Sequence, residues 1–280
     1  MSAVTQNEEM IAFWNGPAGQ AWANNADGQD RELHDLGTAA LDALAATPGE
    51  SVLDVGCGPG TTTLLLAERV GPAGRVVGVD VSAPLLALAS ERAAGFDNVS
   101  FVEADAQTTI PPGSPFDAVF SRFGVMFFGD PDAAFANLHG AMAPNGRLAF
   151  VCWQTPGENP WFLTPLMALA GLPDLEVPPP LGPDEPGPFA FADPDRVRRI
   201  LSAGGWHDVD VRAYHDEIVE DLDQRVEFSL RQGPAARALM NADDDVRAAA
   251  TDSVRDALAQ SARDGVVHLS RAAWIVTARA

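Results

Sequence analysis

The sequence predicts an α/β protein in which short buried strands alternate with helices around a single sheet. Three successive units in residues 51–105 support this fold class. Each unit contains a run of apolar and β-branched residues, of the length expected for a strand buried on both faces, and an acidic residue near the end of that run. Because ligands bind at the carboxyl ends of the strands in such sheets, the acidic residues mark the edge where a ligand would lie.

The first unit contains a glycine-rich turn that we expect to bind a ligand. The apolar run at residues 52–55, which includes Asp54, is followed by the helical pattern of residues 61–70. Three glycines separate the two elements at every second position: Gly56, Gly58 and Gly60. A turn of this kind exposes backbone amide groups beside a helix N-terminus, and the missing side chains let a ligand approach closely.

The spacing of the turn distinguishes between two classes of cofactor. A dinucleotide-binding turn would have its third glycine at position 61, where this chain has Thr61. Pro59 also removes one amide group that could bind a phosphate. Asp54 repels phosphate groups but can hold the ammonium group of a ligand, directly or through water. The turn therefore favours a cofactor without phosphate groups over a nicotinamide dinucleotide.

The second and third units end in acidic residues that suit an adenosine. The strand predicted at residues 75–80 ends in Asp80, whose carboxylate can accept hydrogen bonds from both ribose hydroxyls and disfavours a 2′-phosphate. The strand predicted at residues 99–105 ends in Asp105, which can accept from an adenine amino group. Each aspartate taken singly could be an ordinary turn or helix-capping residue, and it is their common position in three successive units that favours binding.

At these residues the chain resembles the class I S-adenosylmethionine-dependent methyltransferases, whose first motif has an acidic residue two positions before Gly-x-Gly-x-Gly. The resemblance implies a Rossmann-like, doubly wound sheet of seven strands with the last strand antiparallel, and S-adenosyl-L-methionine as the cofactor. It assigns Asp80 to the ribose hydroxyls and Asp105 to the adenine amino group. It places Asp54 and the glycines around the methionine end, with Val81 and Ala106 beside the adenine ring.

The resemblance is close over residues 48–153 and weaker over residues 190–215 and 266–280. The Trp-Asn-Gly stretch at residues 14–16 resembles a bacterial small-molecule subgroup near the quinone-biosynthesis C-methyltransferases. We expect four segments: a helical lid at 1–47, a cofactor-binding core at 48–153, a substrate-capping insertion at 154–195, and the rest of the methyltransferase domain at 196–280. Further helices are expected at 8–14, 31–46, 82–94, 130–142, 193–203, 222–240 and 243–262, and further strands at 116–120, 147–153, 207–214 and 265–278.

Several residues outside the three units are candidates for the cofactor or the acceptor. Trp22 and Gln29 of the lid and Ser121 at the end of the fourth strand are expected near the cofactor. The expected acceptor pocket combines one arginine with mainly aromatic residues: Trp14, Arg122, Phe123, Phe127, Trp153, Asn159, Trp161 and Phe162. Core packing of the aromatic residues, and an ion pair between Arg122 and an interior aspartate, are the alternatives.

The predicted reaction is methyl transfer to a small, largely apolar acceptor, quinone-like or indole-like. Displacement at a sulfonium needs chiefly an aligned nucleophile and the exclusion of water. Tyr214 and His215, near the end of the sixth strand, are candidates for a general base if the acceptor needs one. A nicotinamide-dependent oxidoreductase and a non-catalytic cofactor-binding relative are the alternatives. Whether carbon, oxygen or nitrogen is methylated stays open.

Composition restricts the partners. The net charge of −21 (18 basic against 39 acidic residues) repels nucleic acid and anionic lipid alike. All basic residues are arginines, which excludes Schiff-base catalysis by lysine. Cys57 and Cys152 lack the spacing of a zinc site, so we expect no metal, and two cysteines suit a reducing, cytoplasmic compartment. We expect a small-molecule substrate and no membrane partner, and a homodimer stays open.

Overall fold

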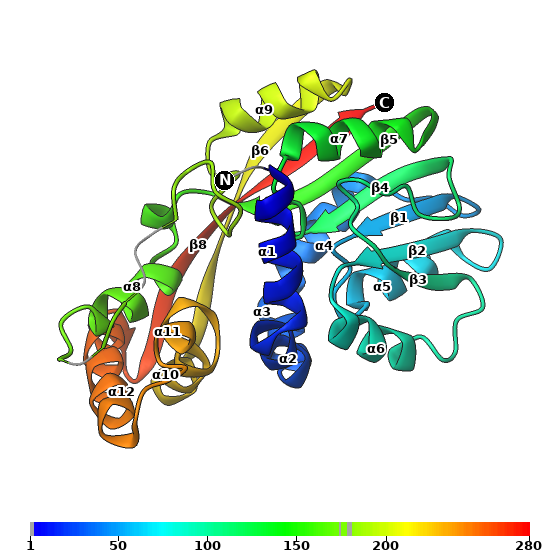
Figure 1. Ribbon diagram of the computed structural model, residues 1–280. Coiled ribbons are helices and arrows are strands. Elements are labelled where there is room, and N and C mark those ends of the chain that lie inside the picture. The colour runs from blue at the N-terminus through cyan, green and yellow to red at the C-terminus, as the bar shows by residue number, and fades with distance from the viewer. Residues whose placement is uncertain (1–2, 174, 178–180) are drawn as a thin grey trace. The chain divides into compact units, whose positions relative to one another are not determined.

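The computed structural model describes residues 3–173, 175–177 and 181–280, and the chain divides into two compact units (Figure 1). The first unit contains residues 1–153, 182–213 and 273–280, and the second contains residues 154–181 and 214–272. This grouping differs from the four predicted segments, because part of the expected insertion falls with residues 214–272. The four-segment division stays a prediction.

The sheet has the strand order β3-β2-β1-β4-β5-β8-β6, with β7 pairing with β8. Strands β1 to β5 pair in parallel, and β8 is antiparallel to β5. The predicted doubly wound sheet with an antiparallel last strand is therefore confirmed, and the short β7 is an addition. The strands are β1 (Ser51–Val55), β2 (Arg75–Asp80), β3 (Val99–Glu103), β4 (Phe116–Arg122), β5 (Met142–Trp153), β6 (His207–Asp221), β7 (Ala262–Arg263) and β8 (Val266–Arg279).

In the first unit, helices cover the two faces of the sheet. Figure 1 shows α5 (Thr61–Val70) and α6 (Ala83–Arg92) on one face and α7 (Pro131–Gly140) and α9 (Pro194–Ala203) on the other. The remaining helices of this unit are α1 (Ala3–Asn15), α2 (Pro17–Asn24), α3 (Ala26–Glu32), α4 (His34–Leu44) and the 3₁₀ turn η1 (Val125–Phe127). Four consecutive helices therefore precede the first strand.

The central strands form the core of the first unit. All five residues of β1 are buried, as are the aromatic side chains of Phe120 on β4 and Phe150 on β5. Parallel strands covered by helices on both faces are expected to be apolar along their whole length. Asp54 is the one charged residue of β1, and its side chain is fully buried. A buried acid in such a strand calls for a functional explanation.

The second unit has an apolar cluster of its own, which includes Leu169, Val226, Leu239, Val254 and Leu258. These residues come mainly from its helices, which are α8 (Pro160–Leu169), α10 (Leu222–Arg231), α11 (Gly233–Ala238) and α12 (Asp244–Ala259), together with the 3₁₀ turn η2 (Pro156–Glu158). The prediction that the segment after β5 is not a simple linker agrees with this packing.

Three predicted helices differ from those of the structure. The helix expected at 31–46 is two helices, α3 and α4, which are separated at Leu33. The helix expected at 222–240 is also two helices, because Gly233 adopts φ +75° and interrupts the helical backbone after Gln232. The last helix ends at Ala259 rather than at residue 262, since the chain turns there into the short β7.

Four predicted strands also differ in length. The fourth strand ends at Arg122 rather than at residue 120, and the fifth begins at Met142 rather than at residue 147. The sixth strand does not end near Tyr214 but continues to Asp221. The third strand ends at Glu103, so Asp105 lies in the turn that follows it.

Within the described part of the chain, no helix combines the length and the apolar character that spanning a membrane requires. Among the same residues, no group of three His, Cys, Asp or Glu side chains is placed to hold a metal ion.

Candidate functional site

The glycine turn after β1 combines a close backbone crossing with open space. Gly56, Gly58 and Gly60 have φ values of +65°, +52° and +84°, which side chains other than glycine rarely adopt. A Cβ atom on Gly56 would lie 2.7 Å from the Cα of Gly124, whereas a Cβ atom on Gly58 would meet nothing within 4 Å. Gly56 is therefore required by packing, and the turn at Gly58 leaves room that a ligand could fill.

Asp54 lies below this turn with one of its carboxylate oxygens unpaired. Its Oδ2 accepts hydrogen bonds from the hydroxyls of Thr62 (2.8 Å) and Thr63 (2.7 Å), in the first turn of α5. Its Oδ1 is buried and has no hydrogen-bond partner within the protein. Burial raises the pKa of Asp54 from 3.8 to about 6, although the two hydroxyls and the charge of Arg122 act in the opposite direction. A cationic ligand group would compensate this unpaired oxygen.

Asp80, the last residue of β2, is hydrogen-bonded to the glycine turn. Its Oδ2 accepts from the backbone amide of Gly58 (2.8 Å), and its Oδ1 accepts from the backbone amide of Ser82 (2.9 Å). Burial raises the pKa of Asp80, and these backbone hydrogen bonds partly counteract the effect. Each oxygen keeps a second lone pair, so the carboxylate can still accept from a diol. The structure thus brings Asp80 and the glycine turn together, as the sequence predicts.

Asp105 has a partner that the sequence did not indicate. The side-chain amide of Asn7, on α1, donates to Asp105 Oδ2, while Oδ1 accepts from the backbone amide of Gln107 (2.9 Å). The neighbouring Ala106 is buried, and its carbonyl accepts from Asn137 (2.9 Å). Nothing in the local sequence around residue 7 points to this contact, because it joins elements almost one hundred residues apart.

The N-terminal helices meet the turn after β2. The side chain of Asn15 donates to the carbonyl of Val81 (2.7 Å) and accepts from the backbone amide of Ala83 (3.0 Å). The Ser82 hydroxyl donates to the carbonyl of Trp14 (2.7 Å). Ser82 occupies the capping position of α6, but its hydroxyl makes no capping hydrogen bond, since it donates to the carbonyl of Trp14.

Aromatic side chains extend this contact. Trp14 meets Trp22 and Phe127 edge to face, with ring centroids 5.7 and 5.4 Å apart. The side chain of Gln29 is buried on α3. Trp14 of α1 and Trp22 of α2 thus pack together, and Trp14 also contacts Phe127 of η1. The cofactor roles of Trp22 and Gln29 stay predictions.

The end of β4 combines a buried hydroxyl with a stacked aromatic pair. Ser121 donates to the carbonyl of Val55 (2.8 Å), which ties β4 to β1 beside the glycine turn. Phe123 adopts φ +62°, and its ring stacks on Trp153 with centroids 4.3 Å apart and planes 18° apart. A phenylalanine with a left-handed backbone conformation is strained, and such strain occurs preferentially at functional sites.

Arg122 forms the ion pair that was the alternative to ligand binding. Its guanidinium donates to Asp30 Oδ1 (2.8 Å), and its side chain is only 9% exposed. Asp30 Oδ2 also accepts from Thr61 (2.6 Å) and Arg92 (3.0 Å). Burial alone would raise the pKa of Asp30. Its hydrogen bonds from Arg122, Thr61 and Arg92, together with the positive charge of Arg122, lower the pKa below its usual value. Asp30 and Arg92 were not singled out from the sequence.

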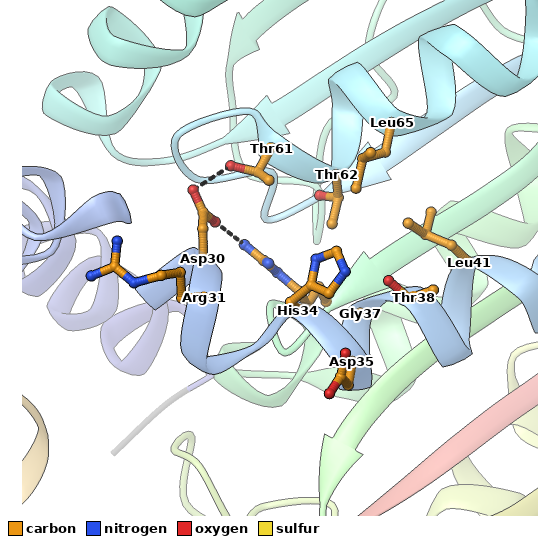
Figure 2. Close-up of a pocket in the computed structure, with 11 residues that line it drawn as sticks. Asp30, Arg31, His34, Asp35, Gly37, Thr38, Leu41, Thr61, Thr62 and Leu65 are labelled. Carbon is orange, nitrogen blue, oxygen red and sulfur yellow. Dashed lines mark hydrogen bonds and ion pairs between the residues drawn. The ribbon is translucent and has the colours of Figure 1, made fainter. Parts of the chain in front are cut away.

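A cavity of about 380 Å³ lies beside this ion pair. Figure 2 shows Asp30 bonded to Thr61 at its wall, with His34 and Thr62 nearby. Asp30 is also bonded to Arg122, which lines the same cavity. The lining comes from α3, α4, α5 and the end of β4, and consists of Asp30, Arg31, His34, Asp35, Gly37, Thr38, Leu41, Thr61, Thr62, Leu65 and Arg122. Because Thr62 also binds Asp54, the cavity wall is linked directly to the buried acid.

The other predicted site residues belong to the second unit. Asn159 is fully buried and binds the backbone of Ala272 in both directions (3.0 Å each), and it accepts from the indole of Trp161 (2.9 Å). These contacts give Asn159 a structural role within this unit. Trp161 and Phe162 meet edge to face at 5.6 Å. Tyr214 and His215 lie within β6, and His215 is exposed. Their catalytic role stays a prediction.

Comparisons with known proteins identify the family of the chain. Residues 52–146 match the family described as "Methyltransferase domain". The chain is 32% identical to a nocamycin O-methyltransferase of Saccharothrix syringae over 209 residues, which cover 71% of this chain and 70% of that protein. It is 35% identical to a 2-phytyl-1,4-naphthoquinone methyltransferase of Nostoc over 123 residues, which cover 43% of this chain and 54% of that protein.

A solved structure, that of YcgJ from Bacillus subtilis, shares the fold with a TM-score of 0.57 and 17% identity, covering 88% of this chain and 98% of that one. The fold, the glycine turn and the length of the match to a methyltransferase relative place this chain in the class I S-adenosylmethionine-dependent methyltransferases, of the small-molecule type.

The residues of the first unit fit the cofactor S-adenosylmethionine. The unpaired oxygen of Asp54 suits the ammonium group of the cofactor's amino-acid end, and the open space at Gly58 lets the cofactor approach the backbone closely. The buried carboxylates of Asp54 and Asp80 disfavour a pyrophosphate at the same place. The chemistry that the cofactor supplies is an activated methyl group on a sulfonium.

Proposed function

We propose that the enzyme methylates a small, flat and largely apolar acceptor, of a quinone-like or other aromatic class. The observation that carries this proposal is the stacked pair of Phe123, directly after β4, and Trp153, the last residue of β5. The two rings are nearly parallel, with centroids 4.3 Å apart, and they lie largely buried at the carboxyl ends of two neighbouring parallel strands, where the ligand is expected. We assign this aromatic pair to the acceptor pocket, because aromatic side chains pack well against planar acceptors.

We assign the cofactor as follows. Asp80 binds the ribose hydroxyls, Asp105 accepts from the adenine amino group, and Val81 and Ala106 flank the adenine. Asp54 and the glycine turn surround the methionine end. Asp80 accepts directly from the amide of Gly58, and Asp54 accepts from Thr62 at the start of the helix that follows the turn; both contacts support this assignment.

The proposed mechanism is in-line displacement, with alignment as the main contribution of the protein. Alignment of two reactants in a closed site is worth about 7 to 11 kcal/mol. Trp14, Trp22 and Phe127 form an apolar cluster of edge-to-face contacts, and we assign to it the exclusion of water from the methyl group. An acceptor with an acidic proton, such as a quinol, needs no strong base, so Tyr214 and His215 are required only for less acidic acceptors.

The names of the relatives support the class of acceptor. One relative is named as a naphthoquinone methyltransferase, and another as an O-methyltransferase. The net charge of −21 also favours a small neutral acceptor over a polyanion such as nucleic acid. We therefore rank naphthoquinols and related phenols first among acceptors.

The proposal is tested by incubating the enzyme with methyl-deuterated S-adenosylmethionine and a matched acceptor panel. The panel contains naphthoquinols, indoles, a phosphorylated amine and a short oligonucleotide, and products are read by mass spectrometry. We expect a labelled product from a planar apolar acceptor and less product when Trp153 is replaced by alanine. Methylation of only the charged acceptors, or cofactor binding without methylation of any acceptor, would contradict the proposal.

A further inference from the structure

Asp30 is the one carboxylate in the described structure of the first unit that joins α3 to three elements of the proposed cofactor site. Its Oδ1 accepts from Arg122 at the end of β4 (2.8 Å). Its Oδ2 accepts from Thr61 at the start of α5 (2.6 Å) and from Arg92 at the end of α6 (3.0 Å). Its side chain is 16% exposed, so these charge-assisted bonds are shielded from water.

Two of these partners hold the glycine turn itself. Thr61 follows Gly60 directly and is the first residue of α5. Arg92 also donates to the carbonyl of Pro59 (3.4 Å) and to the Thr61 hydroxyl (3.1 Å). The end of the turn at Pro59 and Thr61 is therefore held by two charged groups, Asp30 and Arg92. Loss of the Asp30 carboxylate would remove the acceptor of the Thr61 hydroxyl and one partner of Arg92.

The third partner, Arg122, lies between two acids. Its guanidinium is bonded to Asp30, and its positive charge also acts on Asp54, whose Oδ1 is buried and unpaired. Without Asp30, the guanidinium of Arg122 would lose its ion-pair partner, and Asp54 is a carboxylate on which its charge already acts. A guanidinium that turned toward Asp54 would occupy the oxygen that we assign to the cationic end of the cofactor.

We propose that Asp30 is a positioning residue for the cofactor, which holds the glycine turn in place and keeps the Arg122 guanidinium away from the unpaired oxygen of Asp54. The inference rests on the proposed function, because it takes Asp54 as the partner of the cofactor's amino-acid end. Asp30 itself does not need to touch the cofactor. The N-terminal helices thus prepare the site as well as covering it.

The test compares Asp30→Asn with the matched control Asp27→Asn by calorimetric titration with S-adenosylhomocysteine at pH 7.5 and pH 5.5. Asp27 is on the same helix and binds the same Arg92, but its side chain is 85% exposed. We expect Asp30→Asn to weaken binding by about 10-fold or more at pH 7.5, the range for a hydrogen bond to a charged group, and Asp27→Asn to change it by less than about 2-fold.

The pH dependence separates positioning from a merely structural role. Asp54 is faced by Arg122, Asp80 and Cys57 among the charged and titratable groups, and its pKa is raised by burial to about 6. At pH 5.5 Asp54 is largely protonated in the wild type, so the difference between wild type and Asp30→Asn should shrink. A constant ratio at both pH values would assign only a structural role to Asp30.

Three outcomes overturn the inference or its basis. Equal affinity of wild type and Asp30→Asn, with a lower Tm of the variant, overturns the positioning role alone. Equal losses in Asp30→Asn and Asp27→Asn do the same. Absence of binding by the wild type instead overturns the proposed function. If Asp30→Asn does not fold, Thr61→Val keeps both ion pairs of Asp30 and removes one of the hydrogen bonds to its carboxylate. It should still weaken binding by about 3-fold, and unchanged affinity would overturn the inference.

Discussion

Replacement of Asp54 by asparagine should change the stability and the affinity of the enzyme in opposite ways as pH rises. The wild-type carboxylate is fully buried, and burial raises its pKa from 3.8 to about 6. Asparagine has nearly the same shape, and its oxygen can still accept from Thr62 and Thr63, but it carries no charge at any pH.

The magnitude follows from the two pKa values. The folded state binds the proton of Asp54 more tightly than the unfolded state, so the stabilisation is complete below pH 3.8 and is lost as pH rises through about 6. The full loss is about 3 kcal/mol at 1.36 kcal/mol for each pKa unit. Between pH 5 and pH 7 alone, the free energy of unfolding of the wild type should fall by about 1 kcal/mol relative to Asp54→Asn.

The assay is urea unfolding followed by tryptophan fluorescence at pH 5, 6, 7 and 8, for wild type and Asp54→Asn side by side. The lowest pH is above the pI of about 4.3, because a protein with little net charge tends to associate at its pI. Comparison with the variant cancels the titration of the other acidic residues. A stability difference that stays constant from pH 5 to pH 8 would refute the reasoning. In parallel, wild-type affinity for S-adenosylhomocysteine should weaken below pH 6, because the protonated acid no longer attracts the cationic end.

Three further predictions concern other residues. Asp80→Ala should weaken binding of S-adenosylhomocysteine by about 1.5 to 3 kcal/mol, and a near-neutral result in calorimetry would remove Asp80 from the ribose. Glu50→Gln should lower stability by about 1 to 2 kcal/mol at pH 7, since it breaks a bidentate pair with Arg147, and thermal unfolding should show the loss. The effect should disappear as pH falls below the ordinary pKa of 4.5, because the pair lowers the pKa of Glu50; persistence at low pH would contradict it. Cys57 and Cys152 are buried and burial raises the pKa of both thiols, so a thiol reagent should label neither until urea unfolds the chain, and rapid native labelling would refute their burial.

The elements that the sequence predicts well are those whose pattern is local. The first two strands end where the apolar runs end, and the glycine turn adopts positive φ at each of its three glycines. The positions of Asp54 and Asp80 follow from these elements, because a parallel sheet places its carboxyl ends at one edge. Local chemistry thus fixed both the fold class and two acids of the candidate site.

The parts that were not predicted depend on contacts distant in sequence. Asn7 meets Asp105 and Asp30 meets Arg122 across more than ninety residues, and a lone Asn or Asp on a helix carries no signal for such a contact. The sequence does not predict the full length of β6, because residues 214–221 are mostly charged and lack the apolar alternation of a half-buried strand, although the structure buries Ile218 among them. The break at Gly233 was visible as a glycine, but the surrounding helical periodicity outweighed it.

The most direct measurement is a crystal structure of the enzyme with S-adenosylhomocysteine. The account predicts that one ligand touches three carboxylates: Asp80 at the ribose, Asp105 at the adenine, and Asp54 near the amino group. A ligand that left any two of these side chains without contact, or a phosphate group bound beside Pro59, would contradict it.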